Sequence, residues 1–312
     1  MLSRHTYVVC EAESNLEKDG TMRKGKPSAT AEANAAFRAA EWLRPSDERV
    51  CHDQFARYFI GLKFGIIAWS RFLIRIALWY ADRIIPHAAN SVVARTRYID
   101  DYLKACITDG IEQLVILGAG YDSRAYRFDE LKTRVKVFEV DHPDTQRAKI
   151  QKVKRIFGSL PSHVVFVGLD LDERKLGEGL LESGYDKGKK TLFIWEGVTV
   201  YLTPEAIDET LAFVAQNSGK GSSIIFDYAF QSANDAASKN GDAKKWREAY
   251  ERRGEVPKFA VKDDGIEEFL SQRGFYRVES VSMESLKRTY FKGVNENRQV
   301  THFGGIVHAT VR

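Results

Sequence analysis

Short apolar runs rich in β-branched residues recur through the last two thirds of the chain, with helix-like stretches between them. The runs are apolar nearly throughout, which is typical of strands in a parallel sheet that is covered on both faces. The connection between the last two runs looks too short for a helical crossover, so we expect one of them to run antiparallel. The seven expected strands are residues 114–118, 135–141, 163–170, 191–198, 221–229, 274–281 and 302–311.

The first third of the chain has a helical pattern instead. Residues 29–43 are rich in helix formers, and a helical pattern continues over 50–109 with a break around Pro86. Residues 1–27 are loose and charged. The pattern predicts an α/β fold with a mostly parallel seven-stranded sheet and helices on both faces. We expect the chain to divide into a flexible tail (1–27), a helical cap and entry to the core (28–110), and a core (111–312) with a helical insertion at about 230–270.

Residues 55–85 are strongly apolar, but Lys63, Arg71 and Arg75 divide them into runs shorter than the ~20 residues of a membrane span. On one continuous helix, Arg57, Arg71, Arg75 and Asp82 would form a single polar stripe. The favoured interpretation is a buried capping element. A helix lying on a membrane surface and a lining for an apolar substrate pocket are the alternatives. The aromatic residues of this segment include Phe64, Trp69, Phe72 and Trp79.

Composition excludes several classes of function. A net charge of +4 in 312 residues, with one short basic cluster at 23–26, does not indicate a nucleic-acid binder. Cys10, Cys51 and Cys106 form no CxxC motif, which argues against a disulfide framework or a thiolate metal site. The scattered histidines and the lack of HExxH predict no metal site. Sparse cysteines and no visible signal peptide favour the cytoplasm.

The stretch LVILGAGYDSRAYRF, residues 114–128, ends an apolar strand at a glycine-rich turn. Gly118 and Gly120 would let a ligand approach the backbone closely, and a tight strand-to-helix turn is the alternative interpretation. Ser123 replaces the third glycine of a dinucleotide fingerprint, which disfavours a nicotinamide-dependent oxidoreductase. Asp141 ends the second strand, 21 residues after Gly120, where a carboxylate can bind both ribose hydroxyls. A helix N-cap is the alternative role of Asp141.

The third and fourth strands also end in carboxylates, at Asp170 and Glu196. Four successive strands therefore carry a glycine or a carboxylate at the end where doubly wound sheets bind ligands. Because the pyrophosphate cradle is incomplete, the expected ligand is an adenosine without phosphates. S-adenosylmethionine fits this description.

The motifs ARTRYIDDYL, LGAGYDSR, EVDHP, LDLDE and EGVTVYL together resemble the leucine carboxyl methyltransferase family, most of all its bacterial branch. The resemblance is clear over about residues 28–230. It implies a Rossmann-like class I methyltransferase fold with S-adenosylmethionine as cofactor. Arg95 would reach the cofactor carboxylate, Asp141 the ribose, and Glu196 the amino group. The full implied set is Arg38, Arg95, Gly118, Ala119, Gly120, Asp122, Asp141, Asp170, Leu171 and Glu196, with Asp170 and Leu171 at the adenine and Arg38 as the basic residue of the first helix.

Methyl transfer to a carboxylate needs no general base, because the acceptor is already ionised at neutral pH. An alcohol or phenol would need one, and Tyr201 and His302 are the candidates on the acceptor side. Tyr201 matches a tyrosine that faces the acceptor in the family. Both residues are open to a purely structural interpretation. We therefore expect an O-methyltransferase acting on a carboxylate, with hydroxyl oxygen left open.

The acceptor is expected to be a small apolar molecule, such as a polyketide or another secondary metabolite. Relatives that methylate a protein C-terminus have an arginine where this chain has Asp172, which disfavours a protein acceptor. A protein C-terminal carboxyl methyltransferase and a catalytically silent S-adenosylmethionine-binding regulator are the alternatives. The sequence predicts no nucleic-acid partner and no membrane span, and it leaves the oligomeric state open.

Overall fold

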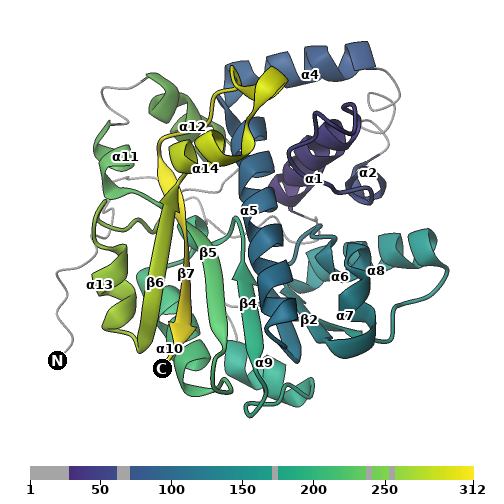
Figure 1. Cartoon of the computed structure of the whole chain (residues 1–312), viewed down its shortest axis with the longest axis vertical. Helices are drawn as coiled ribbons and strands as arrows, with labels where there is room; N and C mark the ends of the chain where they lie inside the picture. The colour runs from purple at the N-terminus through teal and green to yellow at the C-terminus, as the bar shows by residue number, and fades with distance from the viewer. Residues whose placement is uncertain (1–27, 62–70, 171–174, 237–240, 253–256) are drawn as a thin grey trace.

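The computed structural model describes residues 28–61, 71–170, 175–236, 241–252 and 257–312, and shows one sheet with helices on both faces (Figure 1). Its strands are β1 (Gln113–Leu117), β2 (Lys136–Asp141), β3 (Val164–Gly168), β4 (Thr191–Trp195), β5 (Ser223–Ala229), β6 (Phe275–Ser282) and β7 (Gly304–Val311). They are ordered β3-β2-β1-β4-β5-β7-β6. Strands β1 to β5 pair in parallel, and β7 is antiparallel to both neighbours. The Rossmann-like α/β fold expected from the sequence is confirmed.

The seven strands lie where the hydrophobic pattern predicts them, with ends that differ by a few residues. The expected antiparallel strand is β7. The connection before β7 does hold a helix, α14 (Met283–Tyr290), and a 3-10 turn, η2 (Gly293–Asn295). β7 lies between β5 and β6 and pairs antiparallel with both, so this helix does not form a crossover.

Alternate residues of β1 face two separate hydrophobic cores. Leu114 and Ile116 belong to the core covered by α1 (Ala29–Trp42) and α5 (Ala88–Thr108). Val115 and Leu117 belong to the opposite core. The helices α9 (Leu176–Glu182), α10 (Pro204–Gln216) and α13 (Ile266–Ser271) cover that second core. Burial on both faces explains why the strands are apolar at almost every position.

The helical cap lies at the end of the molecule toward which the parallel strands point (Figure 1). There, α4 (Arg71–Ile84) and α12 (Gly241–Glu251) lie above α1 and the first turns of α5. The predicted break around Pro86 is confirmed: His87 adopts φ +63° before α5 begins. Residues 230–270 include the helices α11 (Gln231–Ala236) and α12.

Two expectations for residues 55–85 are wrong. The segment is not one helix, because α2 (Ala56–Phe59) ends at Ile60, which is extended. The polar stripe therefore does not reach Arg57. Helix α4 is also not a buried element, since the side chains of Phe72 and Trp79 are 70% and 58% exposed. The predictions for Phe64 and Trp69, like those for the tail 1–27, lie outside the described residues.

The remaining elements are short or connect the strands. They are α6 (Arg124–Arg127), α7 (Asp129–Arg134), α8 (Pro143–Phe157) and the 3-10 turn η1 (Thr199–Tyr201). Helices α6 to α8 follow β1 and β2, and η1 follows β4. Within the described part of the chain, no helix is both long enough and apolar enough to cross a membrane.

Candidate active site

The turn 118–120 follows β1 and is held by β2. The Ala119 amide donates to the Val140 carbonyl at 2.9 Å, and the Gly120 amide donates to the Asp141 carboxylate. Gly118 has φ +62°, and a Cβ at this position would stand 2.3 Å from Cγ2 of Val198. A side chain at Gly118 is thus excluded by the chain's own packing, in addition to any effect on a ligand.

The Asp141 carboxylate is fixed by backbone amides at the end of β2. Its Oδ1 accepts from the His142 amide at 2.7 Å, and its Oδ2 accepts from Gly120. Burial raises the pKa of Asp141, and the two amide hydrogen bonds oppose this rise. The N-cap of α8 is His142, whose Nδ1 accepts from the Asp144 amide at 3.2 Å. The alternative role of Asp141 as an N-cap is therefore wrong.

Asp170 lies beyond the end of β3, next to His142. Its Oδ2 is 3.4 Å from Nε2 of His142, and both side chains are partly exposed. The two residues therefore form one polar corner beside Asp141. Leu171 and Asp172 lie outside the described residues, so the structure does not test their expected roles.

Glu196, just after β4, sits between two arginines. Its Oε1 is 2.9 Å from Nε of Arg95, and its Oε2 is 2.7 Å from Nη1 of Arg124. Burial alone would raise the pKa of Glu196, but the guanidinium groups of Arg124 and Arg95 hold it well below its usual range. Glu196 is therefore a fixed negative charge at the centre of the carboxyl edge of the sheet.

Asp227, on β5, binds the other side of Arg95. Its Oδ2 is 2.6 Å from Nη1 of Arg95, and its Oδ1 accepts from the Gly197 amide at 2.6 Å. Gly197 has φ +73°, and a Cβ there would stand 3.2 Å from Nη2 of Arg95. The close approach of the Arg95 guanidinium to the backbone thus favours glycine at 197. Both predicted residues, Arg95 and Glu196, are brought together with Asp227.

The ion-pair cluster continues toward α1. Arg124 also pairs with Asp122, whose Oδ1 accepts from the Arg124 amide at 2.7 Å, and with Asp100 at 2.8 Å. Arg38 of α1 forms a separate buried pair with Asp53 at 2.8 Å and donates to the Tyr121 carbonyl at 2.7 Å. Arg38 therefore ties the cap to the loop that follows the glycine turn.

A cavity of about 190 Å³ lies beside this cluster, at the ends of β4 and β5. Arg95, Gly197 and Asp227 form one part of its wall, and α1, α5, η1 and α12 form much of the rest. Its aromatic residues are Phe37, Tyr201, Tyr228, Trp246, Tyr250 and Phe303. Helix α12 is fixed over the cavity by Trp246, whose Nε1 donates to the Pro86 carbonyl at 2.9 Å. The cavity thus combines an aromatic wall with the pair of Arg95 and Asp227, and Arg247 of α12 also lines it.

The structure separates the two candidates on the acceptor side. Tyr201 lines the cavity, and its ring packs edge-on against Tyr250 with centroids 5.6 Å apart. His302 is exposed, although Thr301 and Phe303 on either side of it line the cavity. His302 is therefore not positioned to contact an acceptor held in this cavity.

Several functional candidates were missed by the sequence reasoning. Arg124 is inside the quoted LGAGYDSR motif, and its side chain is only 2% exposed. Asp227 follows the same rule that identified Asp141, a carboxylate near the carboxyl end of a strand. The buried pair of Glu139 and Lys149 could not be recognised from the sequence, because a single charged residue inside an apolar run is normally interpreted as a solvent-exposed position.

The described residues contain no cluster of histidine, cysteine or carboxylate side chains arranged to hold a metal ion. Cys51 and Cys106 are free thiols, and burial raises the pKa of each. Neither thiol lies among the described residues that line the cavity.

Comparison with known proteins gives the same assignment as the motifs. Residues 31–215 match the family model described as leucine carboxyl methyltransferase. A Bacillus subtilis (strain 168) protein, YktD, named as a candidate S-adenosyl-L-methionine-dependent methyltransferase, is 31% identical over 217 residues, which cover 70% of this chain and 71% of YktD.

Two solved structures share the fold. A candidate methyltransferase from Thermobifida fusca YX has a TM-score of 0.59 at 14% identity and covers 93% of this chain and 97% of its own. A DUF574 family protein from Streptomyces avermitilis MA-4680 has a TM-score of 0.55 at 10% identity and covers 89% of this chain and 97% of its own. The family match confirms the resemblance, and the names of the relatives agree with the expected cofactor. The chain therefore belongs to the leucine carboxyl methyltransferase family, a family of S-adenosylmethionine-dependent methyltransferases.

Proposed function

We propose that this chain is an O-methyltransferase that uses S-adenosylmethionine to methylate a carboxylate on a small apolar molecule. The observation that carries the proposal is the aromatic cavity that opens against the pair of Arg95 and Asp227. An apolar acceptor would fill the aromatic part, and its carboxylate would lie at the charged end. That end also adjoins Glu196, where the family resemblance puts the methionine part of the cofactor.

The residues at the carboxyl edge fit the chemistry of the cofactor. Asp141 is a buried carboxylate at the end of β2, suited to two ribose hydroxyls, and Asp170 lies on the adenine side. The amino acid end of the cofactor carries one ammonium and one carboxylate, the same charges that Arg95 and Glu196 present to each other. When bound, S-adenosylmethionine supplies a methyl group on a positively charged sulfur.

The lining of the cavity favours an acceptor that is already ionised. Among the described residues that line it, none is a histidine or a cysteine. Both oxygens of Asp227 are engaged, one with the Gly197 amide and the other with Arg95. The protein would therefore act by holding the two reactants in line and excluding water, rather than by removing a proton.

The shape of the cavity supports a small acceptor over a protein tail. Its walls come from separate elements on several sides, with α12 fixed over it by Trp246. An extended peptide would need an open groove that leads to the reacting carboxylate. Asp172, outside the described part of the chain, is a separate reason to disfavour a protein acceptor.

Isotope-labelled methyl donor tests the proposal directly. The full chain is incubated with labelled S-adenosylmethionine and either a small-molecule extract or a protein extract. We expect label in small apolar compounds, released as methanol by mild alkali because esters hydrolyse readily. Label in proteins would favour the protein carboxyl alternative, and alkali-stable label would exclude an ester. Donor binding without any transfer would indicate a silent regulator. Arg95→Ala is the negative control.

A further inference from the structure

Helix α4 carries more exposed large apolar side chains than any other described element. Eleven large apolar side chains are exposed in the described part of the chain, and five of them lie on this one helix. The other six lie on other segments, and two of them, Tyr58 and Phe157, pack against Phe55. The five are Phe72, Leu73, Ile76, Trp79 and Tyr80, exposed by 70%, 41%, 46%, 58% and 62%. Their spacing puts them on one side of the helix, since positions i, i+4, i+7 and i+8 share a face.

Basic side chains accompany this apolar face. Helix α4 contains three arginines and one aspartate, and the Arg75 and Arg83 side chains are exposed. The Arg83 guanidinium stacks on the Trp79 ring, 4.4 Å from its centroid. Asp82 accepts from the His87 amide at 2.7 Å. The neighbouring α12 carries equal numbers of acidic and basic residues, so the positive character comes from α4.

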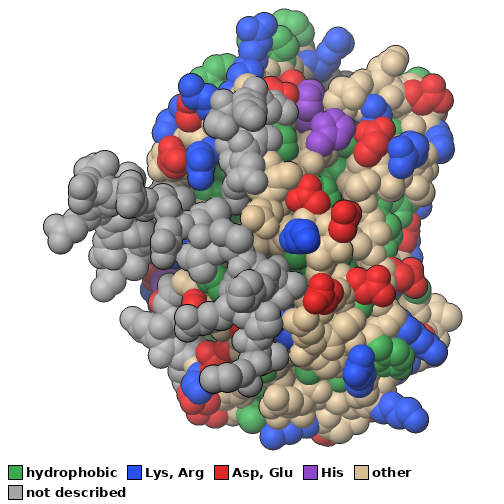
Figure 2. All heavy atoms as spheres, turned by 90° about the vertical axis from the view of Figure 1, so that its left-hand side faces the viewer, with side chains coloured by type: hydrophobic (Ala, Val, Ile, Leu, Met, Phe, Trp, Pro, Cys, Tyr) green, Lys and Arg blue, Asp and Glu red, His purple; other side chains and the backbone are tan. Residues whose placement is uncertain are grey.

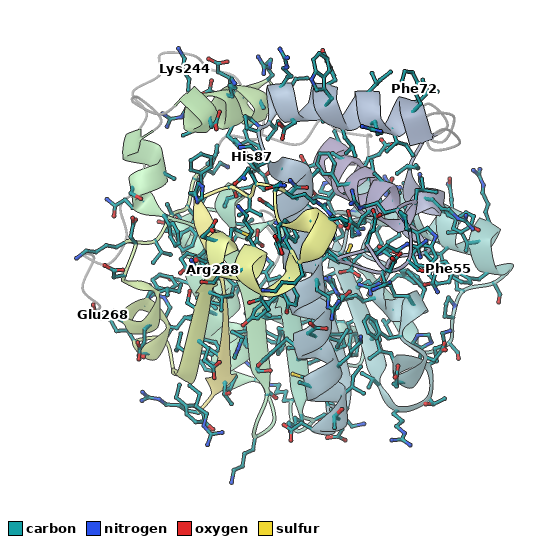
Figure 3. All side chains as sticks on the ribbon, turned by 45° about the horizontal axis from the view of Figure 1, so that its top comes forward. Phe55, Phe72, His87, Lys244, Glu268 and Arg288 are labelled. Carbon is teal, nitrogen blue, oxygen red and sulfur yellow. The ribbon has the colours of Figure 1, made fainter. Side chains whose placement is uncertain are left out.

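The side-chain view shows the same arrangement. In Figure 3, Phe72 on α4 and Lys244 on α12 both project outward from the capped end of the molecule. The face seen in Figure 2 is different: acidic and basic side chains are interspersed there, and hydrophobic ones are scattered. Among the described residues, α4 is the helix on which several exposed aromatic rings and two exposed arginines occur together.

The inward side of α4 leads toward the candidate active site. Ile74 and Leu78 line an open groove of about 790 Å³ between α4, α1, α5 and residues 297–299, and Arg75 and Trp79 of the outer face also border it. Phe37 of α1 lines both this groove and the acceptor cavity. One aromatic side chain thus stands between the cavity and a groove that reaches the exposed helix.

We propose that the outer face of α4 docks on the surface of an anionic lipid bilayer. The rings of Phe72, Trp79 and Tyr80 would lie among the lipid headgroups, as in other amphipathic helices that bind in the plane of a membrane. Arg75 and Arg83 would contact lipid phosphates, and each such contact adds to binding at low salt. Docking would bring the groove to the source of an apolar acceptor.

A second copy of this chain is the competing occupant. Pairing of two α4 faces would bring Arg75 and Arg83 together with their own copies. Helix α4 has a single carboxylate to balance them, and that one is engaged with the His87 amide. Like charges buried in an interface oppose association, whereas anionic lipid neutralises them. Charge thus favours the bilayer.

Co-sedimentation of the full chain with vesicles tests the proposal. The vesicles contain phosphatidylcholine alone or phosphatidylcholine with phosphatidylserine, and neither methyl donor nor acceptor is needed. We expect binding to the anionic vesicles that weakens as salt rises. The double variant Arg75→Glu/Arg83→Glu should bind at least about tenfold more weakly. Phe72→Ser/Trp79→Ser should also lose binding while keeping the melting temperature, because both side chains are exposed.

Tyr276→Ser is the matched control, since Tyr276 is an exposed aromatic residue on β6, away from the cap. It should bind vesicles like the unmodified chain. Absence of vesicle binding by the unmodified chain would overturn the proposal, and so would equal binding by the α4 variants. The face would be assigned to a second copy instead if the unmodified chain were a dimer, the Phe72→Ser/Trp79→Ser variant were a monomer, and neither protein bound vesicles. Donor binding measured on the same variants keeps this result separate from the proposed methyl transfer.

Discussion

Nζ of Lys149 lies 2.9 Å from Oε2 of Glu139 in the interior beneath the glycine turn, where the two side chains are 1% and 0% exposed. The same ammonium donates to the Ala119 carbonyl at 3.2 Å. The Tyr126 hydroxyl donates to Oε2 of Glu139 at 3.0 Å. The turn expected to contact the cofactor therefore rests on a buried ion pair.

Replacing Lys149 should make stability depend strongly on pH. Burial raises the pKa of Glu139 to about 7, above the value of 4.5 it has when unfolded, and Lys149 opposes this rise. In Lys149→Met the folded-state pKa rises further. A group whose pKa is raised by folding loses stability as pH increases between the two values. Removing one partner of a buried pair costs about 3–5 kcal/mol, and we expect the loss to be smaller at about pH 6 than at about pH 8.

Urea denaturation at both pH values measures this effect. The double variant Lys149→Met/Glu139→Gln is the control, because it removes both charges and should recover most of the pH independence. An equal loss for Lys149→Met at both pH values would show that Glu139 is not the titrating group.

Asp141→Ala should weaken binding of S-adenosylmethionine. Loss of a hydrogen-bonded partner costs about 1–3 kcal/mol, which corresponds to roughly fivefold to 150-fold in the dissociation constant. The variant also leaves the Gly120 amide without its carboxylate partner. Isothermal calorimetry measures the change. Asp129→Ala is a suitable control, because the Asp129 side chain is 87% exposed. Unchanged affinity of Asp141→Ala would rule out the ribose contact.

Arg95→Lys should reduce donor affinity about tenfold, although it keeps the charge. The Arg95 guanidinium binds Glu196 and Asp227 through two different nitrogens, and a lysine has only one. Arg97→Lys on the same helix is the matched control, because Arg97 pairs with Asp101 at the surface. Calorimetry on both variants gives the comparison. If Arg95→Lys bound the donor as tightly as Arg97→Lys does, the charge at position 95 alone would matter, and not the forked geometry of arginine.

The sheet could be predicted from the sequence because burial on both faces leaves a strong local signal. Each strand is a short apolar run, and the carboxylate that ends such a run stands out, as Asp141 and Glu196 do. The parallel topology then brings these ends to one edge. For these residues, a place at the end of a strand in the sequence is therefore enough to predict a place at the ligand-binding edge of the sheet.

The cap could not be predicted as well, because its packing depends on contacts between distant segments. Arg38 reads as one more charge on a helix, yet it is buried against Asp53 and the Tyr121 carbonyl. The apolar pattern of α4 suggests burial, whereas Phe72 is 70% exposed. Hydrophobicity shows that such a side chain is favoured away from water, and it does not show what covers it.

The pH dependence of methyl transfer distinguishes the possible acceptor oxygens. A carboxylic acid ionises at about pH 4–5 and a phenol near pH 10, so a carboxylate acceptor should give a rate that is constant above about pH 6. Burial alone would raise the pKa of Glu196, but Arg124 and Arg95 keep it ionised over this range, so the charge beside Arg95 does not change. We expect kcat/KM for the identified acceptor to fall only in acid.

A rate that rises steadily between about pH 8 and pH 10 would indicate a phenol, because the fraction of phenolate grows tenfold with each pH unit until its pKa is reached. In that case Tyr201, a cavity residue at the end of η1, becomes the first group to test, and Tyr201→Phe would be expected to lower the rate without changing donor affinity.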